Sequence, residues 1–160
     1  MPSVWRIATD TPTYEADDLT GAGAKITGGR WNEKGVAVLY CAENISLAAM
    51  ETLVHLGAGA LPLNRYLVRV YIPDDVWAAA ELLDVSTAPV GWDALLAGRA
   101  SIACGTVWLA SKRSACLMVL STITSEESNV LINPAHPDSA KITAQKVRKW
   151  LYDARLLAVK

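Results

Sequence analysis

Three side chains of complementary chemistry lie in the first third of the sequence. Arg30 follows two glycines, Tyr40 closes a short apolar run, and Glu51 interrupts a run that is otherwise largely apolar. A guanidinium stays charged and binds phosphate through a bidentate fork, a phenol can stack on an aromatic ring or donate its hydroxyl, and a carboxylate can orient a ribose. These groups suit a pocket for a nucleotide with a pyrophosphate, a ribose and an aromatic ring.

A loop, a strand and a helix are needed to position these groups. The arginine falls in a polar, glycine-containing segment, and the tyrosine falls in a predicted strand over residues 36–41. The helix that carries Glu51 has Asn44 and Ser46 as candidate caps and is expected to end at Gly57. The three groups therefore come from three successive elements.

Each group also has a simpler interpretation. Arg30 can pair on the surface with Glu33 or Asp18, Tyr40 can be a half-buried residue at a strand end, and Glu51 can face solvent. An unpaired carboxylate on an apolar helix face is costly, which favours a functional role for Glu51.

The rest of the chain predicts short strands and helices in irregular order. Strands are expected at 4–8, 65–72, 114–121 and 129–133, helices at 92–96 and 105–111, a strand or helical turn at 76–83, a loop at 9–25 with one helical turn at 16–19, and a helical or strand-like segment at 139–150. Regular alternation of strands and helices is missing, and the glycines lack the spacing of a dinucleotide-binding fingerprint. We expect a single α+β domain over residues 1–160.

Composition excludes several classes of protein. The 160 residues are 52% hydrophobic and 19% charged with a net charge of −1, so neither disorder nor a nucleic-acid-binding face is expected. No apolar run reaches the roughly 18 residues of a membrane span, and the first residues lack a signal-peptide pattern, so a cytoplasmic location is expected. The mean hydropathy of +0.22 indicates either a dense core or apolar surface that a partner covers.

The three cysteines are expected to be buried free thiols. Cys41, Cys104 and Cys116 are widely spaced among apolar neighbours, and an odd number argues against a disulfide framework. They form no metal-binding motif, so no metal is expected.

Several motifs together resemble the RES-domain family, and the resemblance covers nearly the whole chain. These motifs are Trp5-Arg6, Gly29-Arg30-Trp31-Asn32, Gly35, Val38-Leu39-Tyr40-Cys41-Ala42, Ser46 to Glu51, Gly105, Trp108, Leu120-Ser121 and Asn129 to Asp138. The segment Asn-Pro-Ala-His-Pro-Asp is the most specific, because two prolines flank a histidine at fixed spacing. In one departure, Leu120 stands where the family usually has a proline before the serine.

The resemblance implies an ADP-ribosyltransferase-like fold with a bent or split mixed sheet. It also implies a toxin of a toxin–antitoxin pair that uses NAD as substrate and cleaves the bond between nicotinamide and ribose. The implied partner is a small Xre-type antitoxin with a helix-turn-helix domain, which blocks the active site and binds DNA. Cleavage of this bond passes through an oxocarbenium-like transition state, as in glycoside hydrolysis, so the protein must hold the substrate and stabilise a cation.

The resemblance also assigns roles to residues. Arg30, Tyr40 and Glu51 are expected to be catalytic, and Arg30, Trp31, Tyr40 and Ser121 are expected to contact the dinucleotide. Trp31 can instead pack beneath its loop, and Ser121 can instead cap backbone at a strand end.

Both histidines have an open role. His55 lies four residues after Glu51 on the same helical face, where it either tunes that carboxylate or is a satisfied structural histidine. His136 lies between two prolines and is expected to anchor a loop rather than contact ligand. Asn129 and Asn133 either form turns or contact substrate.

Three functions remain in competition: an enzyme that degrades NAD with water or phosphate as acceptor, a mono-ADP-ribosyltransferase that modifies one protein, and a catalytically weak interaction module. No pro-segment or inhibitory domain is recognised, so we expect restraint by a separately encoded antitoxin, and a homodimer within the complex.

Overall fold

The computed structural model describes residues 1–56 and 61–157, whose strands and helices follow one another in irregular order. Its elements in chain order are β1 (Ser3–Thr9), α1 (Ala22–Thr27), β2 (Leu39–Ala42), α2 (Ile45–Leu53), β3 (Arg65–Tyr71), α3 (Asp74–Ala78), β4 (Glu81–Leu83), α4 (Arg99–Ser111), β5 (Cys116–Leu120), β6 (Ser128–Ile132), the 3-10 helix Pro137–Lys141, β7 (Thr143–Lys149) and the 3-10 helix Ala154–Leu157.

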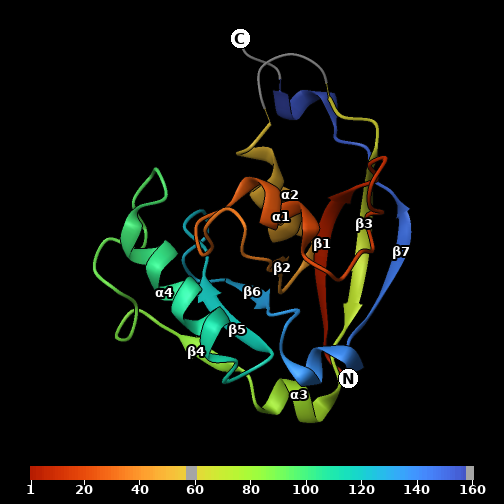
Figure 1. The fold of residues 1–160 in the computed structure, drawn as a ribbon. Helices are drawn as coiled ribbons and strands as arrows, with labels where there is room; N and C mark the ends of the chain where they lie inside the picture. Colours follow the sequence, from red (N-terminus) through yellow and green to blue (C-terminus); the bar gives the residue numbers. More distant parts are fainter. Residues whose placement is uncertain (57–60, 158–160) are drawn as a thin grey trace.

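The seven strands form one mixed sheet that is split near its middle. Their order is β4-β5-β6-β2-β1-β3-β7, and only β4 and β5 run parallel. β1 pairs with β3 along its full length, whereas a single residue pair, Trp5 with Ala42, joins β1 to β2. Figure 1 shows β1, β3 and β7 standing together, while β5 and β6 run in a different direction. The predicted α+β class with a bent or split mixed sheet is confirmed.

Helices α2 and α4 pack against the same face of the sheet, one over each side of the split. α4 packs over a core cluster that contains Trp108, Leu117 and Leu131, and α2 packs over another that contains Ile7 and Leu47. A third cluster fills the opposite face of the sheet. The helices therefore hold the two halves of the sheet from one side, and the split between β1 and β2 is left open beneath them.

The start of α2 is confirmed, because Asn44 caps the helix. Its side-chain oxygen accepts a hydrogen bond of 2.8 Å from the backbone N–H of Leu47, which satisfies one of the free donors of the first turn. The helix ends at Leu53, and the predicted stop at Gly57 lies outside the described residues.

Helix α4 packs unusually close to the loop that carries Arg30. A Cβ atom at Gly105 would overlap the backbone carbonyl of Trp31, so only glycine fits there. Trp108 on the same helix is buried and donates its indole N–H to Ser114 Oγ at 2.9 Å. This packing fixes the loop against the helix.

Some predicted elements were wrong. Residues 92–96 form turns rather than a helix, because the carbonyls of Trp92 and Ala94 accept hydrogen bonds from Arg30. α1 falls partly in the predicted loop; it is short, has no buried residue and has no side-chain cap. α4 begins at Arg99, before the predicted start at 105.

Other predictions were resolved or confirmed. The segment 76–83 contains the end of α3 and all of β4, and the segment 139–150 contains the end of a 3-10 helix and β7. The cysteines are free, with two buried and Cys104 half-buried rather than buried. Within the described residues, no helix has the length and apolar character needed to cross a bilayer.

Candidate active site

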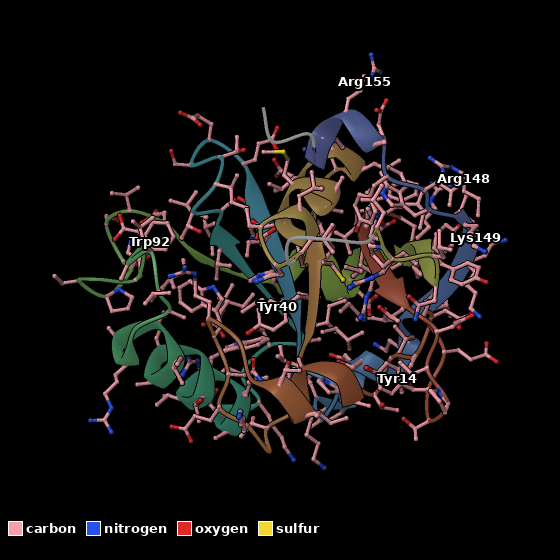
Figure 2. The ribbon with its side chains drawn as sticks, turned by 90° about the horizontal axis from the view of Figure 1, so that it is seen from above. Tyr14, Tyr40, Trp92, Arg148, Lys149 and Arg155 are labelled. Atoms are coloured by element: carbon pink, nitrogen blue, oxygen red, sulfur yellow. The ribbon has the colours of Figure 1, made fainter. Side chains whose placement is uncertain are left out.

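A cleft of about 960 Å³ opens where β1 and β2 separate. Arg30, Tyr40 and Glu51 all line it, so the three groups that the sequence singled out do share one site. Figure 2 shows Tyr40 near the middle of the molecule, between Trp92 on one side and Tyr14 on the other. The walls come from β1, α1 and the loop after it, β2, α2, the loop between β4 and α4, and the loop between β5 and β6.

Glu51 is held at one oxygen only. Its Oε1 accepts hydrogen bonds from Ser121 Oγ at 2.7 Å and from Asn129 Nδ2 at 2.6 Å. Within the part of the chain that the structure describes, Oε2 accepts none. Two donors on one oxygen fix the plane of the carboxylate and leave the other oxygen available to a ligand.

Ser121 lies behind Glu51 rather than in the cleft. It is fully buried, and its hydroxyl also accepts the backbone N–H groups of Ile123 and Thr124 at 3.0 and 3.2 Å. It does not line the cleft, whereas its neighbours Leu120 and Thr122 do. The expected dinucleotide contact of Ser121 stays untested, and its observed contacts are to Glu51 and the loop.

Tyr40 organises the loop that carries Arg30. Its hydroxyl donates to Asn32 Oδ1 at 2.6 Å and accepts the backbone N–H of Trp31 at 3.0 Å. Burial raises the pKa of Tyr40 to about 12, although the hydrogen bond from Trp31 and the charge of Arg30 oppose this rise. The phenol is therefore neutral at physiological pH and offers the cleft an aromatic ring.

Arg30 forms no ion pair with a described carboxylate, so the simpler pairing with Glu33 or Asp18 is not found. Its Nη1 donates to the carbonyls of Trp92 and Ala94 at 2.9 and 2.8 Å. These contacts tie the loop between β4 and α4 to the cleft. Because backbone carbonyls carry no net charge, the positive charge of Arg30 remains for a ligand.

Trp31 lies largely beneath its loop. It is 3% exposed and stacks on Trp92 with ring centroids 6.4 Å apart. It borders the cleft, but most of the indole belongs to the core under α4. A direct contact of Trp31 with a dinucleotide remains a prediction.

The two histidines differ in their surroundings. His55 is exposed and lines the cleft, and both of its expected roles, tuning Glu51 or serving as a satisfied structural histidine, stay predictions. His136 caps the following 3-10 helix, with its Nδ1 accepting the backbone N–H of Asp138 at 3.1 Å, which confirms the loop-anchor interpretation.

Sequence reasoning missed two contributions to the site. Asn32 is buried, and its amide donates to the carbonyls of Ala24, Glu33 and Val36. These hydrogen bonds hold the loop that carries Arg30 together and join it to α1. The place of Asn32 in Gly-Gly-Arg-Trp-Asn was the available signal. Arg6 and Arg65 also line the cleft. Arg6 belongs to the Trp5-Arg6 motif of the resemblance, which was the available signal, whereas Arg65 lies in none of the motifs and only the fold brings it there.

The cleft combines an oriented carboxylate with an aromatic ring and several guanidiniums. Such a site can bind an anionic nucleotide and stabilise positive charge that develops on a ribose. In the described residues, no group of three His, Cys, Asp or Glu side chains is placed to hold a metal ion. The arrangement is that of an α+β domain with a charged, aromatic-lined cleft at a split in its sheet.

This chain belongs to the RES-domain family, whose model matches residues 3–155. It is 62% identical over 155 residues to the "Prs ADP-ribosylating toxin" of Sphingobium sp. (strain YBL2), covering 97% of this chain and 96% of that protein. It is 39% identical over 144 residues to "Toxin Res" of Yersinia enterocolitica, covering 89% and 93% of the two chains. It is also 34% identical over 148 residues to "Toxin Res" of Photorhabdus laumondii, covering 92% and 93%.

Proposed function

We propose that this protein is a toxin that uses NAD and cleaves the bond between nicotinamide and the ribose. The observation that carries the proposal is Glu51, whose Oε1 is held by two donors while Oε2 is left without a partner among the described residues. The toxin names of three relatives, each matched over most of its length, support the biological part of the proposal.

Each group then has a task in the reaction. Nicotinamide leaves with the bonding electron pair, and the positive charge that develops at the ribose is stabilised by the Glu51 carboxylate. The free oxygen of Glu51 binds the ribose, the Tyr40 ring packs against the substrate, and Arg30 binds phosphate. A nucleophile then adds to the ribose carbon and loses its proton, which completes either hydrolysis, phosphorolysis or transfer.

Ser121 and Asn129 act through Glu51. Both donate to Glu51 Oε1, so neither competes with the substrate for Oε2. In this proposal they are positioning residues that fix the direction in which the free oxygen points.

Transfer of ADP-ribose to a protein is the second candidate function. The Sphingobium relative is named as a toxin that ADP-ribosylates Prs, and it shares 62% of its aligned residues with this chain. The same cleft and the same Glu51 serve this reaction, and only the acceptor differs.

A partner is also part of the proposal. Leu95 and Leu96 line the cleft at its mouth and are 100% and 88% exposed, and Val90 in the same loop is 98% exposed. Exposed apolar side chains beside a cation suit an antitoxin segment that is apolar and ends in a carboxylate. We propose an Xre-type antitoxin as this partner, and a homodimer within the complex that operates in the cytoplasm.

Incubation of the purified protein with NAD tests the function. We expect nicotinamide release by the wild type and almost none by Glu51→Gln. Mass spectrometry of the ADP-ribose product separates the acceptors: free ADP-ribose indicates water, ADP-ribose 1″-phosphate indicates phosphate, and a modified protein indicates transfer. Absence of nicotinamide release with water alone, with added phosphate and with added protein as the acceptor would contradict the proposal.

A further inference from the structure

The strands β1, β3 and β7 carry positive charge only. Together they contain six lysines and arginines and no aspartate or glutamate, whereas the whole chain has a net charge of −1. The compensating carboxylates therefore lie in the rest of the chain. A surface that carries one sign of charge favours a partner of the opposite sign.

Three arginines of these strands lie on one face of the sheet. Side chains alternate along a strand, so Arg65 and Arg69 of β3 share a face, and Arg148 of β7 pairs with Leu67 between them. Leu67 belongs to the core cluster beneath α2, so the arginines lie on the same face as this helix. Both lysines of β7 lie on the opposite face.

Aromatic rings hold two of the three guanidiniums. That of Arg69 lies 5.4 Å from the ring centroid of Trp5 and 4.7 Å from that of Tyr71, and that of Arg148 lies 4.7 Å from that of Trp150. A guanidinium stacked on a ring keeps its charge and presents its N–H groups at its edge, ready for a bidentate acceptor. These residues form the arginine–aromatic face, which consists of Trp5, Arg65, Arg69, Tyr71, Arg148 and Trp150.

The arginine–aromatic face lacks acceptors of its own. Within the described residues, none of its three arginines forms an ion pair. Arg65 Nε and Trp150 Nε1 are buried donors without an acceptor in that part of the chain, and the backbone N–H of Trp150 donates to the Arg65 carbonyl at 2.9 Å. Unsatisfied buried donors are costly, so this end of the face suits a partner that supplies carboxylate oxygens.

The composition of the face indicates a protein as that partner. Protein interfaces are rich in tryptophan, tyrosine and arginine and poor in lysine, whereas nucleic-acid surfaces use lysine as well. Exposed apolar side chains flank the end of the face: Leu63 lies two residues before Arg65 and Leu151 follows Trp150, and they are 68% and 64% exposed. Carboxylates beside apolar groups would complement this surface.

Neither a second copy of this chain nor the antitoxin fits the face. β7 is an edge strand, and pairing of this edge between two copies would bring like charges together. The apolar loop with Leu95 and Leu96, which we assign to the antitoxin, lies elsewhere, since Figure 2 shows Trp92 and Arg148 on opposite sides of Tyr40. The face is thus left for another protein.

The face is continuous with the cleft. Trp5 and Arg65 belong to the face and also line the cleft, and Arg69 stacks on Trp5. A standard protein interface covers about 800 Å² on each partner, which is a patch roughly 30 Å across. A protein seated on the face can therefore also reach the mouth of the cleft, where it would present a side chain to the ribose at Glu51.

We propose that the arginine–aromatic face docks an acidic surface of the protein that accepts ADP-ribose. The inference rests on transfer to a protein, the second candidate function above, and it names the surface that recognises the acceptor. The reaction balances as before: nicotinamide leaves with the bonding electron pair, and a nucleophile of the docked protein forms the new bond to the ribose carbon and loses its proton.

Steady-state transfer from biotin-labelled NAD to purified Prs, the protein in the name of the Sphingobium relative, tests the inference. We expect the double variant Arg69→Gln/Arg148→Gln to raise the KM for Prs roughly 10- to 100-fold with little change in kcat, because it loses hydrogen bonds to charged groups. Neither arginine lines the cleft, so calorimetric affinity for ADP-ribose should stay unchanged. Added salt should raise the KM of the wild type more than that of the variant.

Lys149→Gln is the matched control. Lys149 follows Arg148 on β7 and is exposed, but it pairs with Tyr66 and lies on the opposite face of the sheet. This variant removes the same charge from the same strand and should transfer to Prs as the wild type does. If the double variant fails to fold in a thermal melt, Arg148→Gln alone removes an exposed guanidinium and should still raise the KM for Prs.

An unchanged KM for Prs in the folded variant would overturn the inference, and so would an equal rise for Lys149→Gln or a parallel loss of ADP-ribose affinity, which indicates a structural role. An unchanged KM with loss of oligonucleotide binding or of self-association would overturn it as well, because it assigns the face to a nucleic acid or to a second copy. If the wild type releases nicotinamide but does not modify Prs, the inference fails and NAD cleavage stands. The proposed function itself fails only if the wild type releases no nicotinamide.

Discussion

Ser121 donates a hydrogen bond of 2.7 Å to Glu51 Oε1, although 70 residues separate the two in sequence. Ser121 follows β5 and Glu51 lies in α2, so the contact joins one half of the split sheet to the helix that covers the other half. Asn129 of β6 donates to the same oxygen at 2.6 Å. The direction of the carboxylate thus depends on α2, on the loop after β5 and on β6.

Glu51→Gln should retain the fold and lose most NAD turnover. The amide keeps the shape of the side chain but removes the charge that stabilises the developing cation, and loss of one such contact costs on the order of 10²–10³ in rate. Nicotinamide release and a thermal melt should be measured on the same preparation. A folded variant with full turnover would show that Glu51 is not catalytic.

Asn129→Ala should lower kcat with little effect on KM. The variant leaves Oε1 with the Ser121 hydroxyl alone, so the carboxylate is less well oriented, and we expect a loss of roughly 10-fold for one hydrogen bond to a charged group. Asn64→Ala is a suitable control, because the side chain of this exposed asparagine lies outside the cleft and donates to the Asp10 carbonyl. A rise in KM with unchanged kcat would instead indicate that Asn129 contacts substrate.

Gly105→Ala should destabilise the protein and lower activity. The added methyl group overlaps the Trp31 carbonyl, so either α4 or the loop with Arg30 must shift, and overpacking of this kind costs about 1–3 kcal/mol. Urea unfolding gives the loss of stability. Val107→Ala on the same helix is the control, because Val107 is 63% exposed and its truncation should change stability little. Equal stability of the two variants would contradict the close packing.

Titration of Tyr40 should appear in the pH dependence of stability. Its pKa is raised from 10.0 to about 12 by burial, so the folded state holds the phenolic proton more tightly than the unfolded state. The contribution of this proton to the free energy of unfolding is complete below pH 10 and is lost as the pH rises from 10 to about 12. Tyr40→Phe lacks the titrating group, so its free energy of unfolding should fall less steeply over this interval. Identical slopes would show that Tyr40 is not protected from ionisation.

Expression of the wild-type chain in bacteria should arrest growth and lower cellular NAD or modify a protein. Arg30→Ala should relieve the arrest, because it removes both the phosphate-binding cation and the two contacts to the loop between β4 and α4. Co-expression of a cognate antitoxin should relieve it as well. Harmless accumulation of intact, folded wild type with normal NAD and no modified protein would count against a toxin.

Local patterns were enough to predict much of the site. Glycines before Arg30, an apolar run up to Tyr40 and a capped helix with Glu51 are read directly from neighbouring residues, because caps, strands and turns depend on short-range chemistry. The same patterns indicated the α+β class. They failed at residues 92–96, where Arg30 takes the carbonyls that a helix would need.

Tertiary structure alone decided how these residues act together. The single pair between Trp5 and Ala42 sets the split, and the split brings Arg6 into the cleft. Ser121 became a partner of Glu51 because β5 ends and β6 begins beside α2. Such contacts join residues far apart in the chain, and no local pattern encodes which strand ends meet.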